Sequence, residues 1–142
     1  MNVRRREVLK AAAALGTLPF FAELAAQDGK KMKLGMIGSG NVGSNLGRVW
    51  ARAGHEVMFS SRNLDADKKL AAEIGANARA GTPREAAAFG EVLVFAVPYG
   101  ALPELGKSLA GEIKGKVIID ACNPFPQRDG EVATRAREKG AG

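Results

Sequence analysis

The sequence contains little of what metal sites and covalent cross-links require. Its 142 residues include one cysteine, Cys122, and one histidine, His55. A lone cysteine excludes an internal disulfide and a cysteine-based metal cluster within this chain, so we expect no metal site. Because no base lies close to it in the sequence, Cys122 is interpreted as a small buried thiol rather than a nucleophile. His55 directly follows a glycine and is interpreted as a turn residue.

Aromatic residues are also scarce, at 6% of the chain, and no basic run is interleaved with them. The composition therefore does not favour a nucleic-acid partner. The formal net charge is +6, and residues 1–26 hold four basic and two acidic side chains, which leaves +4 for the remainder. A mild positive field of this kind suits an anionic small molecule. The length and composition are those of one globular domain.

A hydrophobic run long enough to form a stable membrane span is absent. The apolar run over residues 11–21 is too short for a bilayer. The preceding sequence RREVLK resembles the twin-arginine export motif, although Arg4 and Val8 replace residues that the motif prefers. We predict that residues 1–26 are a twin-arginine signal peptide and that the protein is exported, to the periplasm. The alternative is an amphipathic N-terminal helix on a cytoplasmic protein.

Beyond residue 30, apolar strands alternate with helices. Strands are predicted over residues 31–37, 55–60, 77–80, 91–97 and 116–121. Helices are predicted over residues 41–53, 65–74, 83–89, 102–109 and 130–139. This alternation predicts an α/β fold, a Rossmann-type doubly wound parallel sheet with strand order 3-2-1-4-5, within one domain over residues 31–142. The sixth strand of such a sheet is missing, so we expect the domain to be incomplete at its C-terminus.

Two expectations concern burial. The continuous apolar runs at residues 91–97 and 116–121 predict strands covered on both faces of the sheet. In the first helix, apolar residues recur at helical spacing and predict the face that packs on the sheet. These residues are Val42, Leu46, Val49 and Trp50.

The stretch IGSGNVGSNLG, residues 37–47, contains the pattern G-x-G-x-x-G between a predicted strand and a predicted helix. That context is typical of a dinucleotide-binding turn. Gly38 would make the tight turn, Gly40 would let the backbone approach a pyrophosphate, and Gly43 would let the helix pack closely. The N–H groups at the start of the helix would bind the phosphates. The predicted contact residues are Gly38, Ser39, Gly40, Asn41, Val42 and Gly43; the alternative is a glycine-rich turn without a ligand.

The second strand ends in Ser60-Ser61-Arg62, and no acidic residue follows before Asp65. An acidic residue at this place would bind the ribose hydroxyls and repel a 2′-phosphate. A guanidinium with two serine hydroxyls as donors would instead bind a 2′-phosphate. We therefore predict NADP(H) rather than NAD, the alternative being a polar loop with a surface arginine.

The fourth and fifth strands end in Ala96-Val97-Pro98 and in Asn123-Pro124. Pro98 has no N–H and stops the strand where a cofactor would cross the sheet edge. Asn123 is placed to hydrogen-bond the nicotinamide or its ribose. Strand termination alone is an equally simple interpretation of both ends.

Three stretches together, residues 33–63, 95–102 and 116–125, resemble the NADP oxidoreductases that depend on coenzyme F-420, a deazaflavin. The shared features are the glycine loop, the Ser-Arg pair after GHEV, and the AVP and DAxNP strand ends. The resemblance covers residues 31–142. It implies that the glycine loop holds the pyrophosphate, that Ser61 and Arg62 hold the 2′-phosphate, and that Ala96, Val97 and Pro98 lie near the nicotinamide.

The family moves a hydride directly between NADPH and the deazaflavin, which implies no dedicated catalytic residue, only the juxtaposition of two rings. Family members continue with a last strand and a segment that completes the deazaflavin pocket, and this sequence lacks both. The sequence is compatible with three hypotheses about the function of the chain. The chain is an NADP(H)-dependent oxidoreductase domain with a small-molecule deazaflavin or flavin-like partner, a non-catalytic NADP-binding module or fragment, or part of another reductase, such as a pyrroline-carboxylate reductase or a metalloreductase. A homodimer is a further expectation.

Overall fold

The computed structural model describes residues 29–140. The chain from Lys31 onward forms one compact unit. The signal peptide predicted for residues 1–26 lies outside the described residues. Over the described part of the chain, no helix has both the length and the apolar character needed to cross a membrane.

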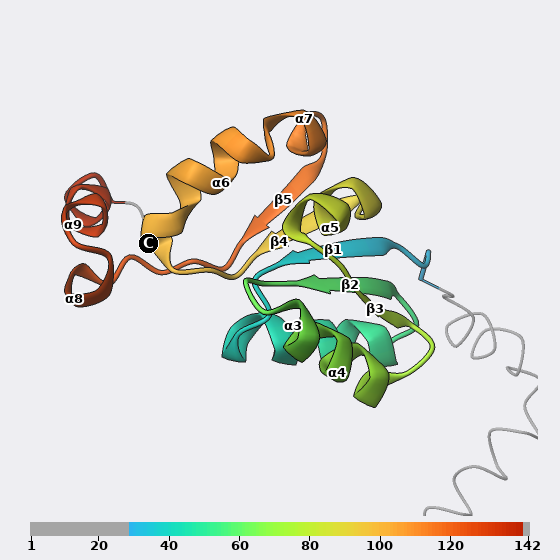
Figure 1. Ribbon diagram of the computed structural model, residues 1–142. Coiled ribbons are helices and arrows are strands. Elements are labelled where there is room, and N and C mark those ends of the chain that lie inside the picture. Colours follow the sequence, from blue (N-terminus) through green and yellow to red (C-terminus); the bar gives the residue numbers. More distant parts are fainter. Residues whose placement is uncertain (1–28, 141–142) are drawn as a thin grey trace, which may run out of the picture. The chain divides into compact units, whose positions relative to one another are not determined.

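The strands form one parallel sheet in the order β3-β2-β1-β4-β5, as the alternation of elements predicts (Figure 1). Their bounds are β1 Lys33–Ile37, β2 Glu56–Ser60, β3 Ala78–Ala80, β4 Val92–Phe95 and β5 Val117–Asp120. Strand β1 is central, and its Gly35 pairs with Met58 of β2 and Leu93 of β4. All carboxyl ends therefore meet at one edge, where parallel α/β sheets bind their ligands.

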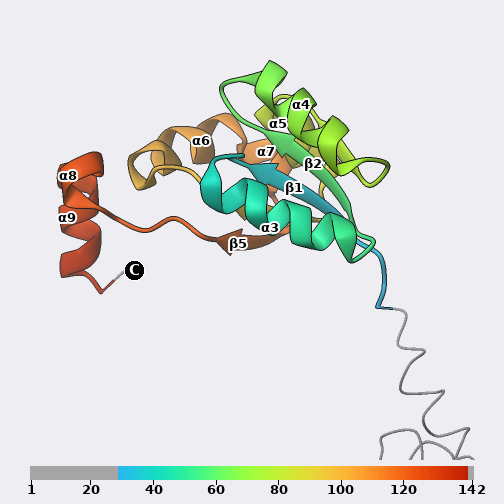
Figure 2. The ribbon, with the colours of Figure 1, turned by 90° about the horizontal axis from the view of Figure 1, so that it is seen from below.

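Helices cover both faces of the sheet (Figures 1 and 2). On one face lie α3 (Asn41–Arg52) and α4 (Leu64–Ile74), and on the other lie α5 (Pro83–Phe89), α6 (Leu102–Ser108) and α7 (Ala110–Ile113). The 3-10 turn η1 (Tyr99–Ala101), α8 (Pro126–Asp129) and α9 (Glu131–Glu138) lie beyond the carboxyl ends of the strands. Helices α7 and α8 and the turn η1 were not expected, because they are too short to show a periodic pattern.

Each face of the sheet has its own apolar core. The α3–α4 side buries Leu34, Met36, Ala51, Val57, Phe59 and Val94. The α5–α7 side buries Ile37, Ala86, Ala87, Leu93, Phe95, Leu109 and Cys122. Strands β1, β2 and β4 contribute to these cores and are the fixed frame from which the loops at the carboxyl edge extend.

Helix α3 packs most closely through small residues, and of its four predicted apolar residues only Leu46 and Trp50 are partly buried against the core. Its buried positions are Gly43, Gly47 and Ala51, while Val42 and Val49 are 52% and 62% exposed. The expectation that both valines face the sheet was therefore wrong. A Cβ atom on Gly47 would collide with the Phe59 ring, so the helix lies too close to the sheet for larger side chains on that stripe.

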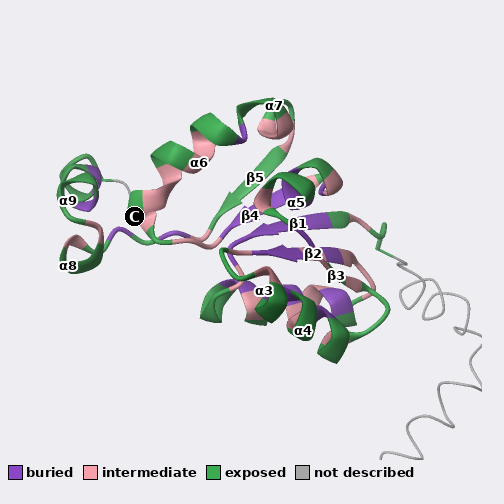
Figure 3. Cartoon of the chain, in the orientation of Figure 1, coloured by how far each residue is buried: buried purple, intermediate pink, exposed green. Residues whose placement is uncertain are grey.

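Strand β5 is exposed, which corrects the expectation of a buried fifth strand. Val117, Ile118 and Ile119 are 62%, 44% and 41% exposed, and Figure 3 shows the strand in green along its length. Ile119 is in register with Val94, which belongs to the α3–α4 side. Because α3 and α4 pack under β1, β2 and β3, no described helix packs closely on β5 from the side where Val117 and Ile119 lie.

Candidate functional site

The glycine loop between β1 and α3 has the conformation that the sequence pattern requires. Gly38 has φ +103°, a left-handed value that other residues rarely adopt. A Cβ atom there would also collide with the Ala96 carbonyl. The Gly38 N–H donates to the Ser60 carbonyl at 2.9 Å, which fixes the turn against the end of β2. The chain therefore enters α3 through a tight turn that only glycine fits.

The N-terminus of α3 is suited to binding an anion. Gly40 caps the helix, and a Cβ atom on it would meet nothing within 4 Å, so the backbone faces open space at this point. The first turn of α3 contains no acidic residue. The N–H groups at a helix N-terminus carry partial positive charge and lack partners within the helix. Gly40, Asn41 and Val42 could therefore hold a pyrophosphate here.

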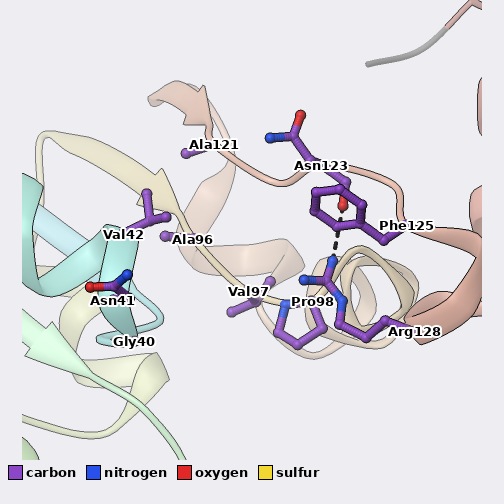
Figure 4. Close-up of a pocket in the computed structure, with 10 residues that line it drawn as sticks. All are labelled: Gly40, Asn41, Val42, Ala96, Val97, Pro98, Ala121, Asn123, Phe125 and Arg128. Atoms are coloured by element: carbon purple, nitrogen blue, oxygen red, sulfur yellow. Dashed lines mark hydrogen bonds between the residues drawn. The ribbon is translucent and has the colours of Figure 1, made fainter.

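A cavity of about 250 Å³ opens at the carboxyl edge of the sheet beside this helix start (Figure 4). The structure thus brings together residues that the sequence places far apart. The lining residues are Gly40, Asn41, Val42, Ala96, Val97, Pro98, Ala121, Asn123, Phe125 and Arg128. Seven of these ten are residues that the sequence predicts to contact a cofactor, which supports a single elongated site over β1, β4 and β5.

The loop after β2 lies outside this cavity and differs from expectation in its hydroxyl groups. Ser60 is fully buried, and its hydroxyl donates to the Met36 carbonyl at 2.6 Å. It therefore supports the strand rather than the surface that a phosphate would touch. The Ser61 hydroxyl donates to the Asp67 carboxylate at 2.8 Å. Arg62 is exposed and forms no ion pair within residues 29–140.

Three lining residues, Ala121, Phe125 and Arg128, were missed from the sequence, and the last two interact with each other. The Arg128 guanidinium lies 5.1 Å from the centre of the Phe125 ring and donates to the Asn123 carbonyl at 2.9 Å, as Figure 4 shows. It also pairs with Asp129 at 2.7 Å. This hydrogen bond from Arg128 lowers the pKa of Asp129 to about 2. An aromatic residue near a basic one after the fifth strand was the available signal, but α8 has only four residues and no periodicity.

Asp129 anchors this wall of the cavity. Its carboxylate accepts hydrogen bonds from the Phe125 N–H at 3.0 Å and the Gly100 N–H at 3.2 Å. The bond from Gly100 connects α8 with η1, which follows β4, and the bond from Phe125 closes the start of α8. The ring of Phe125 and the charge of Arg128 are therefore held at the cavity mouth.

Cys122 is buried, as expected, and is not part of the cavity lining. Its thiol donates to the Phe95 carbonyl at 3.3 Å and accepts from the Val97 N–H at 3.4 Å. Burial raises the pKa of the thiol to about 11, so it stays protonated and is a poor nucleophile. The described residues contain no cluster of three metal-ligating side chains.

Residues 33–124 match the family described as NADP oxidoreductase coenzyme F420-dependent. The chain belongs to this family. The match spans the glycine loop, the loop after β2 and the ends of β4 and β5, and it includes all the lining residues of the cavity except Phe125 and Arg128.

Two curated members of the family are similar to the chain. The F420-dependent NADP reductase of Methanothermobacter thermautotrophicus is 31% identical over 112 residues, which cover 73% of this chain and 48% of the relative. The enzyme of the same name from Methanothermobacter marburgensis is 36% identical over 114 residues, with coverage of 73% and 50%. The chain thus spans about half the length of the curated relatives that it matches.

Solved structures support the same family and fold. A crystal structure of an F420-dependent NADP-reductase candidate from Arthrobacter sp. FB24 is similar with a TM-score of 0.56 and 27% identity, over 66% of this chain and 46% of that one. The imine reductase of Streptomyces aurantiacus has a TM-score of 0.57 at 22% identity, over 77% of this chain and 38% of that one. The latter likeness concerns the fold alone.

Proposed function

We propose that this chain is the NADP(H)-binding part of an oxidoreductase that moves a hydride between NADPH and a deazaflavin or flavin-like acceptor. One observation carries the proposal: the cavity joins the open helix start at Gly40 to the strand ends at Pro98 and Asn123. This arrangement fits a pyrophosphate at one end and a nicotinamide at the other. When bound, NADPH supplies the hydride.

The residues of the chain position the cofactor and take no part in the reaction themselves. Gly40, Asn41 and Val42 offer backbone N–H groups to phosphate oxygens, while Ala96 and Val97 offer an apolar wall to a planar ring. The cavity lining contains no histidine and no carboxylate. Direct hydride transfer requires no general acid or base, and most of the rate enhancement comes from holding two rings in contact. The chemical character of the lining therefore agrees with this reaction class.

The proposal is tested in two steps with the full chain. Calorimetric titration should show that NADPH binds at least about tenfold more tightly than NADH, or roughly 1.4 kcal/mol. Oxidation of NADPH should then be followed by absorbance, with a deazaflavin and with a flavin as acceptors. Binding without turnover would favour the alternative, a non-catalytic NADP-binding module, and failure to bind either nucleotide would contradict both readings.

We also propose export by the twin-arginine route, supported by the RREVLK sequence near the start of the chain. The route carries folded proteins, which would allow a nucleotide to leave the cytoplasm already bound. Replacing both Arg5 and Arg6 by lysine should retain the protein in the cytoplasm in a cell-fractionation assay. Unchanged distribution of this variant would contradict the proposal.

A further inference from the structure

One buried carboxylate connects the glycine loop with the loop after β2. Asp67 lies in the first turn of α4 and is 1% exposed. Its Oδ1 accepts a hydrogen bond from the Ser39 hydroxyl, and its Oδ2 accepts one of 2.8 Å from the Ser61 hydroxyl. Ser39 and Ser61 are the two hydroxyl residues that remain candidates for contact with the cofactor once Ser60 is buried. Their hydroxyl groups are thus engaged before a cofactor arrives.

The number of protons limits what these serines can do. A hydroxyl carries one donor hydrogen, and an ionised carboxylate can only accept. Ser39 therefore directs its single proton toward Asp67, and Ser61 directs its proton toward Asp67 at 2.8 Å or toward the Asn63 carbonyl at 3.4 Å. The Asn63 N–H donates to the Ser61 oxygen at 3.1 Å, which occupies one of its lone pairs as well. Neither hydroxyl then has a proton to offer to a phosphate.

The negative charge of Asp67 also weakens the binding of a phosphate. A carboxylate removed from water is weakly screened, so it repels a nearby phosphate more than an exposed carboxylate would. Arg62, which is exposed, is the cation that the loop after β2 provides. The attraction of a 2′-phosphate to this loop therefore depends on Arg62 and is opposed by Asp67.

We propose that Asp67 limits the preference of this site for NADPH over NADH, because it keeps the protons of Ser39 and Ser61 away from the 2′-phosphate. The inference rests on the proposed function, since it concerns the same nucleotide. It assigns two roles: Arg62 binds the 2′-phosphate, and Asp67 is a specificity-determining residue beneath it.

The test is Asp67→Asn, with dissociation constants for NADPH and NADH measured by calorimetry on the full chain. An asparagine can accept from one serine and donate to the other, which releases one hydroxyl proton. The neutral side chain also removes the repulsion. We expect NADPH to bind about tenfold more tightly, as one charge-assisted hydrogen bond would produce, and NADH affinity to change by less than about threefold.

The matched control is Asp65→Asn. Asp65 lies in the same turn of α4 but is exposed and pairs with Lys68 at 3.9 Å. This variant removes the same charge from the same helix without freeing a hydroxyl, so the NADPH-to-NADH ratio should change by less than about threefold. An unchanged or reduced ratio in Asp67→Asn would overturn the inference, as would an equal increase in both variants.

A second variant keeps the inference testable if Asp67→Asn does not fold. Arg62 is exposed, so Arg62→Ala should retain the fold. Without Arg62, NADPH should bind no more tightly than NADH, because the repulsion from Asp67 remains. A remaining preference for NADPH would show that the serines donate to the phosphate and would overturn the inference. If the wild-type chain binds neither nucleotide, the proposed function itself fails, whereas binding of both with unaltered ratios refutes Asp67's role alone.

Discussion

Gly40 shows how the absence of a side chain can matter more for binding than for folding. Its φ of −64° is open to any residue, and a Cβ atom would meet nothing within 4 Å. A larger residue would therefore be accommodated by the protein and would extend into the space proposed for the pyrophosphate. Binding and stability can be separated at this position.

We expect Gly40→Val to abolish NADPH binding while the free energy of unfolding falls by no more than about 1 kcal/mol, because valine is a poorer N-cap than glycine but its Cβ meets no other atom of the protein. Calorimetric titration and thermal denaturation measure the two quantities. Retained affinity would contradict the placement of the pyrophosphate at the start of α3.

The Cys122 thiol should make the stability of the folded protein depend on pH. Burial raises its pKa from 9.0 to about 11, so the folded state holds the proton more tightly than the unfolded state. Its contribution to stability is therefore complete below about pH 9 and is lost as the pH rises toward 11. Thiol labelling of the folded protein at pH 8 should be much slower than labelling in denaturant.

Cys122→Ser provides the comparison for this prediction. A serine can form the same two hydrogen bonds, to the Phe95 carbonyl and from the Val97 N–H, but its hydroxyl does not titrate. In denaturant titrations between pH 9 and 11, the variant should therefore lose less stability than wild type. Parallel curves would show that other groups determine the alkaline response.

At the scale of elements, α3 depends on its stripe of small residues. We expect Gly47→Ala to lower the free energy of unfolding by about 1–2 kcal/mol, because the overlap with the buried Phe59 ring outweighs the helix propensity of alanine. Urea denaturation measures the change. Gly106→Ala in α6 is the control, since its Cβ would meet nothing within 4 Å and only the gain in propensity applies. Stabilisation by both substitutions would contradict the close packing of α3.

Elements that depend on nearby residues could be predicted from the sequence, whereas features that depend on contacts with distant segments could not. The sheet order and most helices depend on local alternation of apolar and polar residues, and they are confirmed. The exposure of β5 could not be predicted, because an apolar run shows what a strand can bury and not whether a helix covers it. The exposure of Val42 and Val49 was missed for a related reason: the stripe of Gly43 and Gly47 decides which side faces the sheet.

The site was predictable where one short motif determines it and not where distant segments meet. The glycine loop and the strand ends at Pro98 and Asn123 lie together as expected. The bond between Ser39 and Asp67, residues 28 positions apart, has no local signature. Phe125 and Arg128 follow a strand end and lie at and in α8, a single helical turn that is too short to show periodicity.

At the scale of the whole molecule, the edge of the sheet at β5 is unusual. It presents Val117, Ile118 and Ile119 with no described strand beyond it. Edge strands usually carry charges, prolines or bulges that prevent pairing with other chains. Here the edge is apolar, so we expect the chain to self-associate as its concentration rises; the homodimer expected from the sequence stays a prediction.

Val117→Lys should reduce this self-association with little loss of stability, because the side chain is 62% exposed. Sedimentation velocity over a range of concentrations measures the effect. Val49→Lys on α3 is the control, since that valine is equally exposed at 62% but lies on a helix. An equal effect of both substitutions would point to general surface hydrophobicity rather than to the strand edge.

The cavity should make the unfolding of the domain more cooperative when a ligand is bound, because its walls come from segments near the beginning and the end of the domain sequence. Gly40 and Val42 belong to the first crossover, whereas Phe125 and Arg128 follow the last strand. A ligand bound between them would contact both segments. At a concentration of about 100 times its dissociation constant, it would add about 2.7 kcal/mol to the stability of the folded state. Amide exchange should then slow together at the β1–α3 turn and at α8, two segments that share no backbone hydrogen bond.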